Sequence, residues 1–205
     1  MPNWCHNELH FGIAADRDVA TIMQQIKERC AGTTEDGKQV ALDFSRIVPP
    51  PDDPAYRDIP DQKTAKKSPL WWFDWNVENW GTKWNCRDSL WVCSEPRPKS
   101  DDMLTFNTAW SPPFPIAQEL SKLFEDVVFH LRFEEGGNYF AGDYIYVNGR
   151  LHFSHDREYD EFYCPWDEGI IEHLLSELSN KDHTQFWKGV DPDTVEEGDD
   201  IGSLE

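Results

Sequence analysis

The sequence predicts an α+β fold in which two β-α-β units build one antiparallel sheet covered by helices. Two patterns carry this prediction: alternation of apolar and polar residues in strands, and apolar residues at helical spacing next to capping residues. The third observation is their order along the 205 residues, strand-helix-strand twice with a tryptophan-rich segment between. A chain of this length is one domain that can bury a sizeable core.

The first unit follows directly from the N-terminal third of the chain. Apolar and polar residues alternate through 4–13, which predicts a strand. Asp16 is a candidate cap for a helix that Gly32 ends. A second alternating stretch, 40–47, predicts the next strand, which ends before a run of three prolines because proline cannot continue a ladder.

The second unit repeats this order after the tryptophan-rich segment. Ser111 followed by proline marks the start of its helix. Asn148-Gly149 is a strong signal for a hairpin, and the last apolar stripe has helical spacing. The expected elements are strands 102–108 and 127–134, a hairpin of 139–147 and 150–154, and a final helix 167–179.

This order of elements is the split βαβ, or ferredoxin-like, plan. We therefore predict a ferredoxin-like antiparallel sheet with an added β-hairpin, a Trp-rich insertion at about 49–100 and a C-terminal helix, all within one domain, 1–190. Residues 191–205 have seven acidic and no basic side chains, which predicts a disordered tail. The sheet face away from the helices must be solvated, covered or used, because it collects His6, Glu8, His10, Asp43, Thr105, Asn107, His130, Arg132 and Glu134.

The chain is strongly acidic, with 39 Asp and Glu against 19 Lys and Arg and a formal net charge of -20. Nucleic-acid binders neutralise phosphates with basic residues, so this charge repels DNA, RNA and anionic membranes. We expect no direct nucleic-acid binding and no membrane binding. The same charge suits a basic protein partner, including one whose basic groove the chain occupies as a mimic of nucleic acid, although acidity more often only provides solubility.

The cysteines and the N-terminus bear on the cellular compartment. Five cysteines, an odd number without a dense framework, argue against a disulfide scaffold. The N-terminus lacks the basic and apolar stretches of a signal peptide, and no apolar run approaches the about 20 residues that cross a membrane. These observations predict a cytoplasmic protein with reduced thiols.

Six of the ten tryptophans lie between Trp71 and Trp91. Flat rings beside hydrogen-bonding side chains suit a ligand pocket or a partner surface, and they equally suit a second small core. Lys83 stands between Trp80 and Trp84, where the two rings could enclose a flat ligand whose anionic group meets the ammonium. A packed turn with an outward lysine fits the same residues. The candidate binding residues here are Asn79, Trp80, Gly81, Lys83, Trp84 and Asn85.

Trp110 and three residues of a predicted strand complete the candidate binding site. Trp110 lies in a strand-to-helix turn, either near the site or packed under the insertion. Glu134 shares a strand face with His130 and Arg132, while the glutamate next to it faces the other way, so the two glutamates cannot form an acid–base pair. Glu134 would act as a base with a histidine, or pair with Arg132 at a solvated edge.

Seven histidines raise the question of a metal site. His6 and His10 lie on one face of the first strand but are too far apart to share one ion directly, and a site is conceivable with His130 and Glu134 of an adjacent strand. The chain has no Cys-x-x-Cys, His-Glu-x-x-His or calcium-loop motif. We therefore predict neither a cofactor nor a metal, and the catalytic residues, if any, stay unknown.

Four motifs stand in order along the chain: Pro2-Asn3-Trp4-Cys5-His6-Asn7, Glu78-Asn79-Trp80-Gly81-Thr82-Lys83-Trp84-Asn85, Thr108-Ala109-Trp110-Ser111-Pro112-Pro113, and Phe133-Glu134-Glu135-Gly136-Gly137 followed by Phe140-Ala141-Gly142. Together they resemble the YubB-type ferredoxin-like family of phages, conjugative plasmids and their bacterial hosts, over residues 2–153. The resemblance implies the ferredoxin-like fold and a cytoplasmic accessory protein of a mobile element, one that acts against host defence. It implies no catalytic residues.

Two functional hypotheses follow from the sequence. The first is a non-enzymatic binding protein that engages a protein partner or a small anionic ligand through its Trp-rich surface. The alternative is a small enzyme or sensor acting on a nucleotide-like anionic molecule, with Glu134 and His130 transferring protons while Lys83 and Arg132 hold anionic groups. The alternative requires these four side chains to converge in one cleft.

Overall fold

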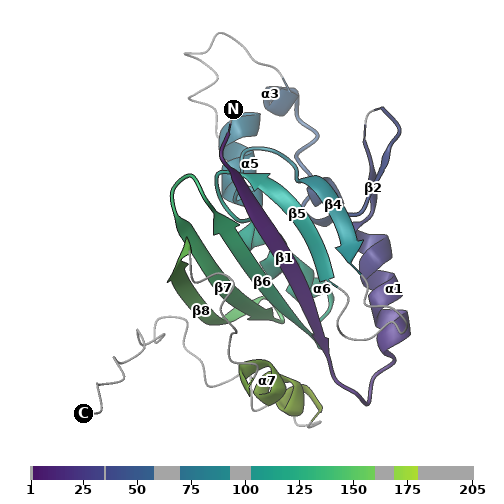
Figure 1. The fold of residues 1–205 in the computed structure, drawn as a ribbon. Helices are drawn as coiled ribbons and strands as arrows, with labels where there is room; N and C mark the ends of the chain where they lie inside the picture. The colour runs from purple at the N-terminus through teal and green to yellow at the C-terminus, as the bar shows by residue number, and fades with distance from the viewer. Residues whose placement is uncertain (1, 35, 58–69, 93–102, 160–168, 180–205) are drawn as a thin grey trace, which may run out of the picture.

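The protein folds around one six-stranded antiparallel sheet with the strand order β4-β5-β1-β6-β7-β8 (Figure 1). The structure, a computed structural model, describes residues 2–34, 36–57, 70–92, 103–159 and 169–179. The strands of the sheet are β1 (Trp4–Ile13), β4 (Arg87–Val92), β5 (Met103–Ala109), β6 (Val127–Glu135), β7 (Phe140–Val147) and β8 (Arg150–Glu158). The helices are α1 (Val19–Cys30), α2 (Phe44–Ile47), α3 (Pro54–Arg57), α5 (Trp72–Trp80), α6 (Phe114–Leu123) and α7 (Gly169–Ser179).

The connections of the four strands β4, β5, β1 and β6 confirm the predicted ferredoxin-like fold class. β1-α1-β4 and β5-α6-β6 are two split βαβ units, because each helix joins two strands that have a third strand between them in the sheet. The predicted hairpin is β7 and β8, which extends the sheet beyond β6. Its turn, Asn148-Gly149, has φ values of 47° and 75°, as a two-residue hairpin turn requires.

The second strand of the first unit is not where the sequence placed it. The predicted strand 40–47 is wrong: Gln39–Val40 is β3, which pairs only with β2 (Gly32–Thr33) in a separate two-stranded sheet. Phe44–Ile47 is helical because the Asp43 carboxylate accepts a hydrogen bond from the Ser45 amide and caps the helix. The position beside β5 belongs to β4, inside the stretch assigned to the Trp-rich insertion.

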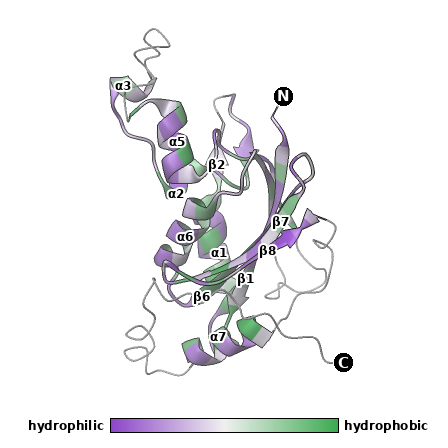
Figure 2. Ribbon diagram, turned by 90° about the vertical axis from the view of Figure 1, so that its left-hand side faces the viewer, coloured by the Kyte–Doolittle hydropathy of each residue, from purple (hydrophilic) through white to green (hydrophobic). Residues whose placement is uncertain are grey.

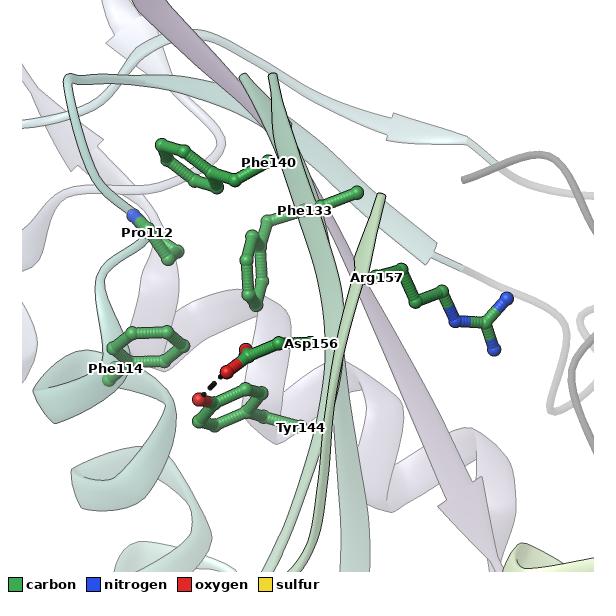
Figure 3. A pocket seen from close by; sticks show the side chains of 8 residues that line it. Pro112, Phe114, Phe133, Phe140, Tyr144, Asp156 and Arg157 are labelled. Carbon is green, nitrogen blue, oxygen red and sulfur yellow. Dashed lines mark hydrogen bonds between the residues drawn. The ribbon is translucent and has the colours of Figure 1, made fainter. Parts of the chain in front are cut away.

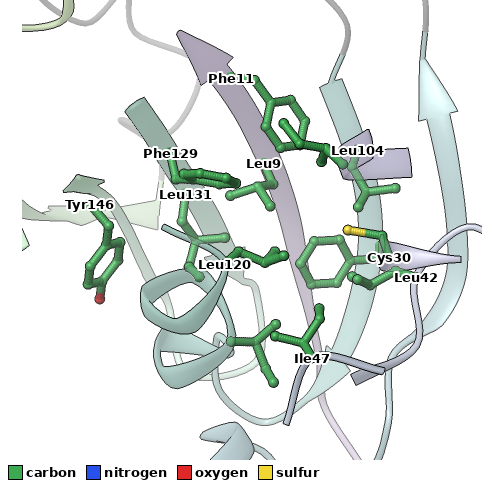
Figure 4. Close-up of a cluster of buried hydrophobic side chains, with 14 of the residues drawn as sticks. Leu9, Phe11, Cys30, Leu42, Ile47, Leu104, Leu120, Phe129, Leu131 and Tyr146 are labelled. Carbon is green, nitrogen blue, oxygen red and sulfur yellow. The ribbon is translucent and has the colours of Figure 1, made fainter. Parts of the chain in front are cut away.

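The main core lies between the sheet and the helices α1, α2 and α6 (Figure 2). Period-two alternation puts the apolar side chains of β1, β5 and β6 on this face, and helical spacing puts apolar stripes of α1 and α6 against them. Figure 4 shows how these side chains interlock. The contributors with the least exposure include Leu9, Phe11, Ile26, Cys30, Leu104, Leu120, Phe129 and Leu131.

A smaller core occupies the opposite face of the sheet, where the predicted C-terminal helix, α7, packs. Its helix residues Leu174 and Leu178 cluster with Val128 and Ile145 of the sheet. Gly12 gives α7 room to approach, since a Cβ there would lie 3.1 Å from the Val128 Cβ and 3.3 Å from a methyl of Ile171 on α7. α7 covers one end of this face (Figure 1), and the other end carries polar side chains.

Several sequence predictions fall outside the described residues. They are the acidic tail 191–205, part of the insertion, and the cysteines Cys93 and Cys164. Asp18 rather than the predicted Asp16 caps α1, through hydrogen bonds from the amide and hydroxyl of Thr21. Among the described helices, none combines the length and the hydropathy that a membrane crossing demands.

Candidate functional site

The structure separates the ten candidate residues into three groups. Asn79, Trp80, Gly81 and Asn85 hold a turn together. Lys83, Trp84 and Trp110 form an exposed cluster, which we call the Lys83 surface. His130, Arg132 and Glu134 lie on the sheet face opposite the main core.

Trp80 and Asn85 make contacts that support the fold. Trp80 is only 4% exposed, packs edge-to-face on Phe44, and donates its indole N–H to the Val48 carbonyl at 2.9 Å. The side-chain oxygen of Asn85 accepts hydrogen bonds from the amides of Phe44 and Cys86. Asn79 donates to the carbonyl of Trp75, one turn back in α5. These three predicted binding residues therefore have internal partners.

Gly81 ends α5 in the left-handed conformation, at φ 78°, which glycine adopts without a Cβ penalty. Pro112 and Pro115 approach its backbone closely. A Cβ at this position would lie 2.8 Å from Pro115 Cδ and 3.1 Å from the Pro112 carbonyl oxygen. Gly81 thus allows the turn after α5 to pack on the start of α6.

We expect Gly81→Ala to lower the free energy of unfolding by about 2–3 kcal/mol, from left-handed backbone strain plus overpacking. Gly37→Ala is the matched control, because Gly37 has φ 83° but nothing lies within 4 Å of its added Cβ. That control isolates the backbone strain, about 1 kcal/mol. Urea denaturation of the two variants measures the difference in their free energies of unfolding. Equal losses of stability would show that Pro112 and Pro115 move aside for the added Cβ at little cost.

The Lys83 surface forms where two turns are bound together. The Thr82 hydroxyl donates to the Ala109 carbonyl at 3.0 Å, and the Ser111 hydroxyl donates to the Gly81 carbonyl at 2.6 Å. These bonds join the turn after α5 to the turn after β5. Trp110 has a φ of 72°, which is uncommon for a large side chain, and its amide donates to the Asn3 carbonyl.

At this junction the Lys83 ammonium lies over several aromatic rings. Its Nζ is 4.5 Å from the centroid of the Trp84 ring and 4.9 Å from that of Trp110. The rings of Phe73 and Trp72 in α5 are 5.4 and 6.0 Å away. Trp84 and Trp110 keep 37% and 42% of their surface exposed, with ring centroids 6.3 Å apart. The arrangement presents two flat rings and one cation together to solvent.

The third group, His130, Arg132 and Glu134, belongs to a polar network on the far face of the sheet. On β1, Glu8 lies between His6 and His10, with ion-pair distances of 3.8 and 3.4 Å. The hydrogen bond from His10, aided by His6, holds the pKa of Glu8 far below its usual value. The Glu8 carboxylate in turn raises the pKa of His6. Arg132 of β6 reaches Glu8 at 3.8 Å and continues the network.

Asp143 on β7 is the centre of this network, although it was not among the sequence candidates. It is 1% exposed and meets His130 Nε2 at 2.8 Å, Arg132 Nε at 3.0 Å and Arg157 Nε at 2.8 Å. Burial acts to raise the pKa of Asp143, but these cationic and N–H groups outweigh it and the pKa is lowered. Burial lowers the pKa of His130, so a neutral ring donates from Nε2 to the carboxylate.

Glu134 and Glu135 face opposite sides of β6, as predicted. Glu135 is buried and accepts hydrogen bonds from the amides of Gly137 and Asn138, so it shapes the turn into β7. Glu134 is opposite His6 of β1. Over the ranges that the structure describes, no three His, Cys, Asp or Glu side chains are grouped to hold a metal ion.

A pocket of about 420 Å³ lies between the start of α6 and the strands β6, β7 and β8, and none of its lining residues was among the sequence candidates for a site (Figure 3). We call it the aromatic pocket. Its rings come from Phe114, Phe133, Phe140 and Tyr144, with Asp156 at the edge. These residues come together only through the register of β7 with β6 and with β8, which residue patterns alone specify weakly.

A comparison with family models agrees with the ferredoxin-like fold class. Residues 79–174 match the model of a family described as "Ferredoxin-like domain in Api92-like protein". A crystal structure of a protein api92 from Yersinia pseudotuberculosis is 14% identical, with a TM-score of 0.46, covering 77% of this chain and 98% of that chain. A search of curated proteins finds no match. From the end of α5 into α7, the chain is therefore similar to the ferredoxin-like domain of Api92-like proteins.

Proposed function

We propose that this is a non-enzymatic binding protein that engages a protein partner through the Lys83 surface. One observation carries the proposal: Trp84 and Trp110 remain 37% and 42% exposed while they flank one ammonium. Exposed tryptophan side chains are costly to keep in water and dominate the binding energy of many interfaces. The hydrogen bonds between the two turns hold the rings in place before a partner arrives, which lowers the entropic cost of binding.

Charge supports a basic partner. The chain carries a net charge of -20, which would steer a basic protein towards it, and it would occupy a basic groove as nucleic acid does. The buried, free thiols of Cys5 and Cys30, whose pKa values burial raises to about 12, suit a reducing cytoplasm. The resemblance to the YubB-type family supports a role as an accessory protein of a phage or plasmid that counters a host defence.

The geometry favours binding over the enzymatic alternative. The aromatic contacts of Lys83 come from α5, from Trp84 and from the turn after β5. His130 and Arg132 instead contact Asp143 on the sheet face opposite the main core. His130 is also 1% exposed, so a substrate would have to displace the network to reach it. An enzyme that uses these residues together would need them in one open cleft.

The proposal is tested with tagged full-length protein purified from its native host, with its partner identified by mass spectrometry. The purified partner is then titrated against the wild type and the Trp84→Ala/Trp110→Ala double variant. We expect at least about 30-fold weaker binding, as for interface hot spots. Leu123→Ala is the matched control, because Leu123 is an exposed apolar residue, 49% accessible, at the other end of α6. It should leave the affinity unchanged.

Unchanged affinity in the folded double variant would refute the Lys83 surface as the binding site. Native mass spectrometry of the same preparation separates a protein partner from a small anionic ligand. A small mass that is lost on denaturation, and lost from Lys83→Ala, would assign the surface to a ligand with a flat ring and an anionic group. The melting temperature of each variant shows that the fold is intact.

A further inference from the structure

The aromatic pocket owes its shape to a row of three residues across the added hairpin. Phe133 of β6 pairs with Gly142 of β7, which pairs with Asp156 of β8, so all three share the face that α6 covers. A Cβ at Gly142 would lie 2.5 Å from Phe133 Cζ and 2.9 Å from the His155 carbonyl oxygen. The missing side chain lets the Phe133 ring lie over β7 and leaves space in front of Asp156.

Aromatic rings form the walls of this space. Phe114 and Tyr144 stack with their centroids 4.4 Å apart, and the Phe133 ring meets Phe114 edge-on at 5.3 Å. Phe140 closes the far side, with its centroid 6.1 Å from that of Phe133 (Figure 3). Phe133 is buried and the other three rings are half-buried. Such walls bind apolar groups and, through the negative faces of the rings, cations.

Asp156 is the acidic side chain among the described residues that line the pocket. The Tyr144 hydroxyl donates to its Oδ1 at 3.2 Å. Burial, together with the Asp156 charge, raises the pKa of Tyr144, so the hydroxyl keeps its proton and remains a donor. A carboxylate can accept several hydrogen bonds, so Asp156 can also receive one from a ligand. Arg157 points away from the pocket (Figure 3), to the face where it meets Asp143.

We propose that the aromatic pocket binds an organic ammonium ion with an apolar body. The body packs on Phe114, Phe133 and Phe140, and the ammonium pairs with Asp156 beside the Tyr144 ring. A volume of about 420 Å³ is in the range of small-molecule sites. The net charge of -20 raises the local concentration of cations and disfavours anionic ligands. This site is independent of the Lys83 surface, because its rings and its charge are different residues.

The test compares three probes that share one body and differ in charge: phenethylammonium, phenethyl alcohol and phenylacetate. Calorimetric titration of the full-length protein at pH 7 should rank their affinities in that order, with the cation at least about fivefold tighter than the alcohol. Asp156→Asn should remove this preference, lowering the affinity for the cation about fivefold and leaving that for the alcohol unchanged. Asp156 is exposed, so the variant is expected to fold.

Glu125→Gln is the matched control for the variant, since it removes the same charge from an exposed acid that does not line the pocket. It should keep the preference for the cation. Equal affinities for the cation and the alcohol in the wild type, or an unchanged preference in Asp156→Asn, would overturn the proposal. N-acetyl-lysine amide, as a fourth probe, distinguishes the sources of the ammonium: tighter binding than phenethylammonium would identify a lysine side chain. Trp84→Ala should bind the cation normally whether or not the Lys83 surface has a partner.

Discussion

Asp143→Asn is expected to destabilise the protein by about 3–5 kcal/mol, the range for breaking a buried charge network by removing one partner. Asparagine has almost the same shape, so the loss reports charge rather than packing. His130, Arg132 and Arg157 converge on this one carboxylate, which is 1% exposed. With a neutral residue there, the two guanidinium groups stay partly desolvated and lose their shared counter-ion. The free energy of unfolding from urea titration measures this loss.

The matched control is Asp156→Asn, on the neighbouring strand. Asp156 is exposed, and its hydrogen bond comes from the Tyr144 hydroxyl, so its loss should stay within about 0.5 kcal/mol. A loss below about 1 kcal/mol for Asp143→Asn would contradict the assignment of Asp143 as the centre of the network. It would mean that the Arg132 and Arg157 guanidinium groups find hydrogen-bond partners among other side chains or water when the Asp143 charge is removed.

Period-two alternation predicted the strands whose two faces differ most in polarity. In β1, Cys5, Asn7, Leu9 and Phe11 are buried while His6, Glu8 and His10 between them are half-buried, and the strand bounds match 4–13. β4 has no such contrast because it is an edge strand. Its apolar residues Leu90 and Val92 are exposed, and a register shift follows Arg87. Alternation at 40–47 was a false signal, since Asp43 caps a helix whose buried residues are three apart.

The candidate site was predicted only where its residues are neighbours in sequence. Lys83 and Trp84 are adjacent, and Trp110 joins them through the turn contacts. Asp143 on β7 contacts side chains from the two neighbouring strands, β6 and β8. The aromatic pocket combines residues at and just before the start of α6 with residues of three strands. Such sets depend on register, which residue patterns alone specify weakly. The high density of tryptophan also did not predict which rings are buried and which are exposed. The burial of each ring depends on residues that contact it in the fold but lie far from it in the sequence.

Trp80→Ala and Trp84→Ala should separate these two roles of tryptophan. We expect Trp80→Ala to cost about 3–5 kcal/mol, because it leaves a large cavity beside Phe44 and Trp75 and an unpaired carbonyl at Val48. Trp84→Ala removes a ring that is 37% exposed, and should cost about 1 kcal/mol or less. Chemical denaturation, followed by far-UV circular dichroism, gives the free energy of unfolding for each variant.

The stabilities of Trp80→Ala and Trp84→Ala together show whether the Lys83 surface is part of the core or free to bind a partner. A small loss in Trp84→Ala together with a large loss in Trp80→Ala means that the fold does not need the Trp84 ring, so its exposure is available for a partner. Equal losses would mean that the Lys83 surface is a second core, one of the two interpretations that the sequence allowed. Lys83→Ala sharpens the result: its ammonium contacts rings by cation–π attraction, which is worth about 0.5–1 kcal/mol at exposed sites. A larger loss of unfolding free energy in Lys83→Ala would show that the ammonium holds the rings in place and is not a group left available for a ligand.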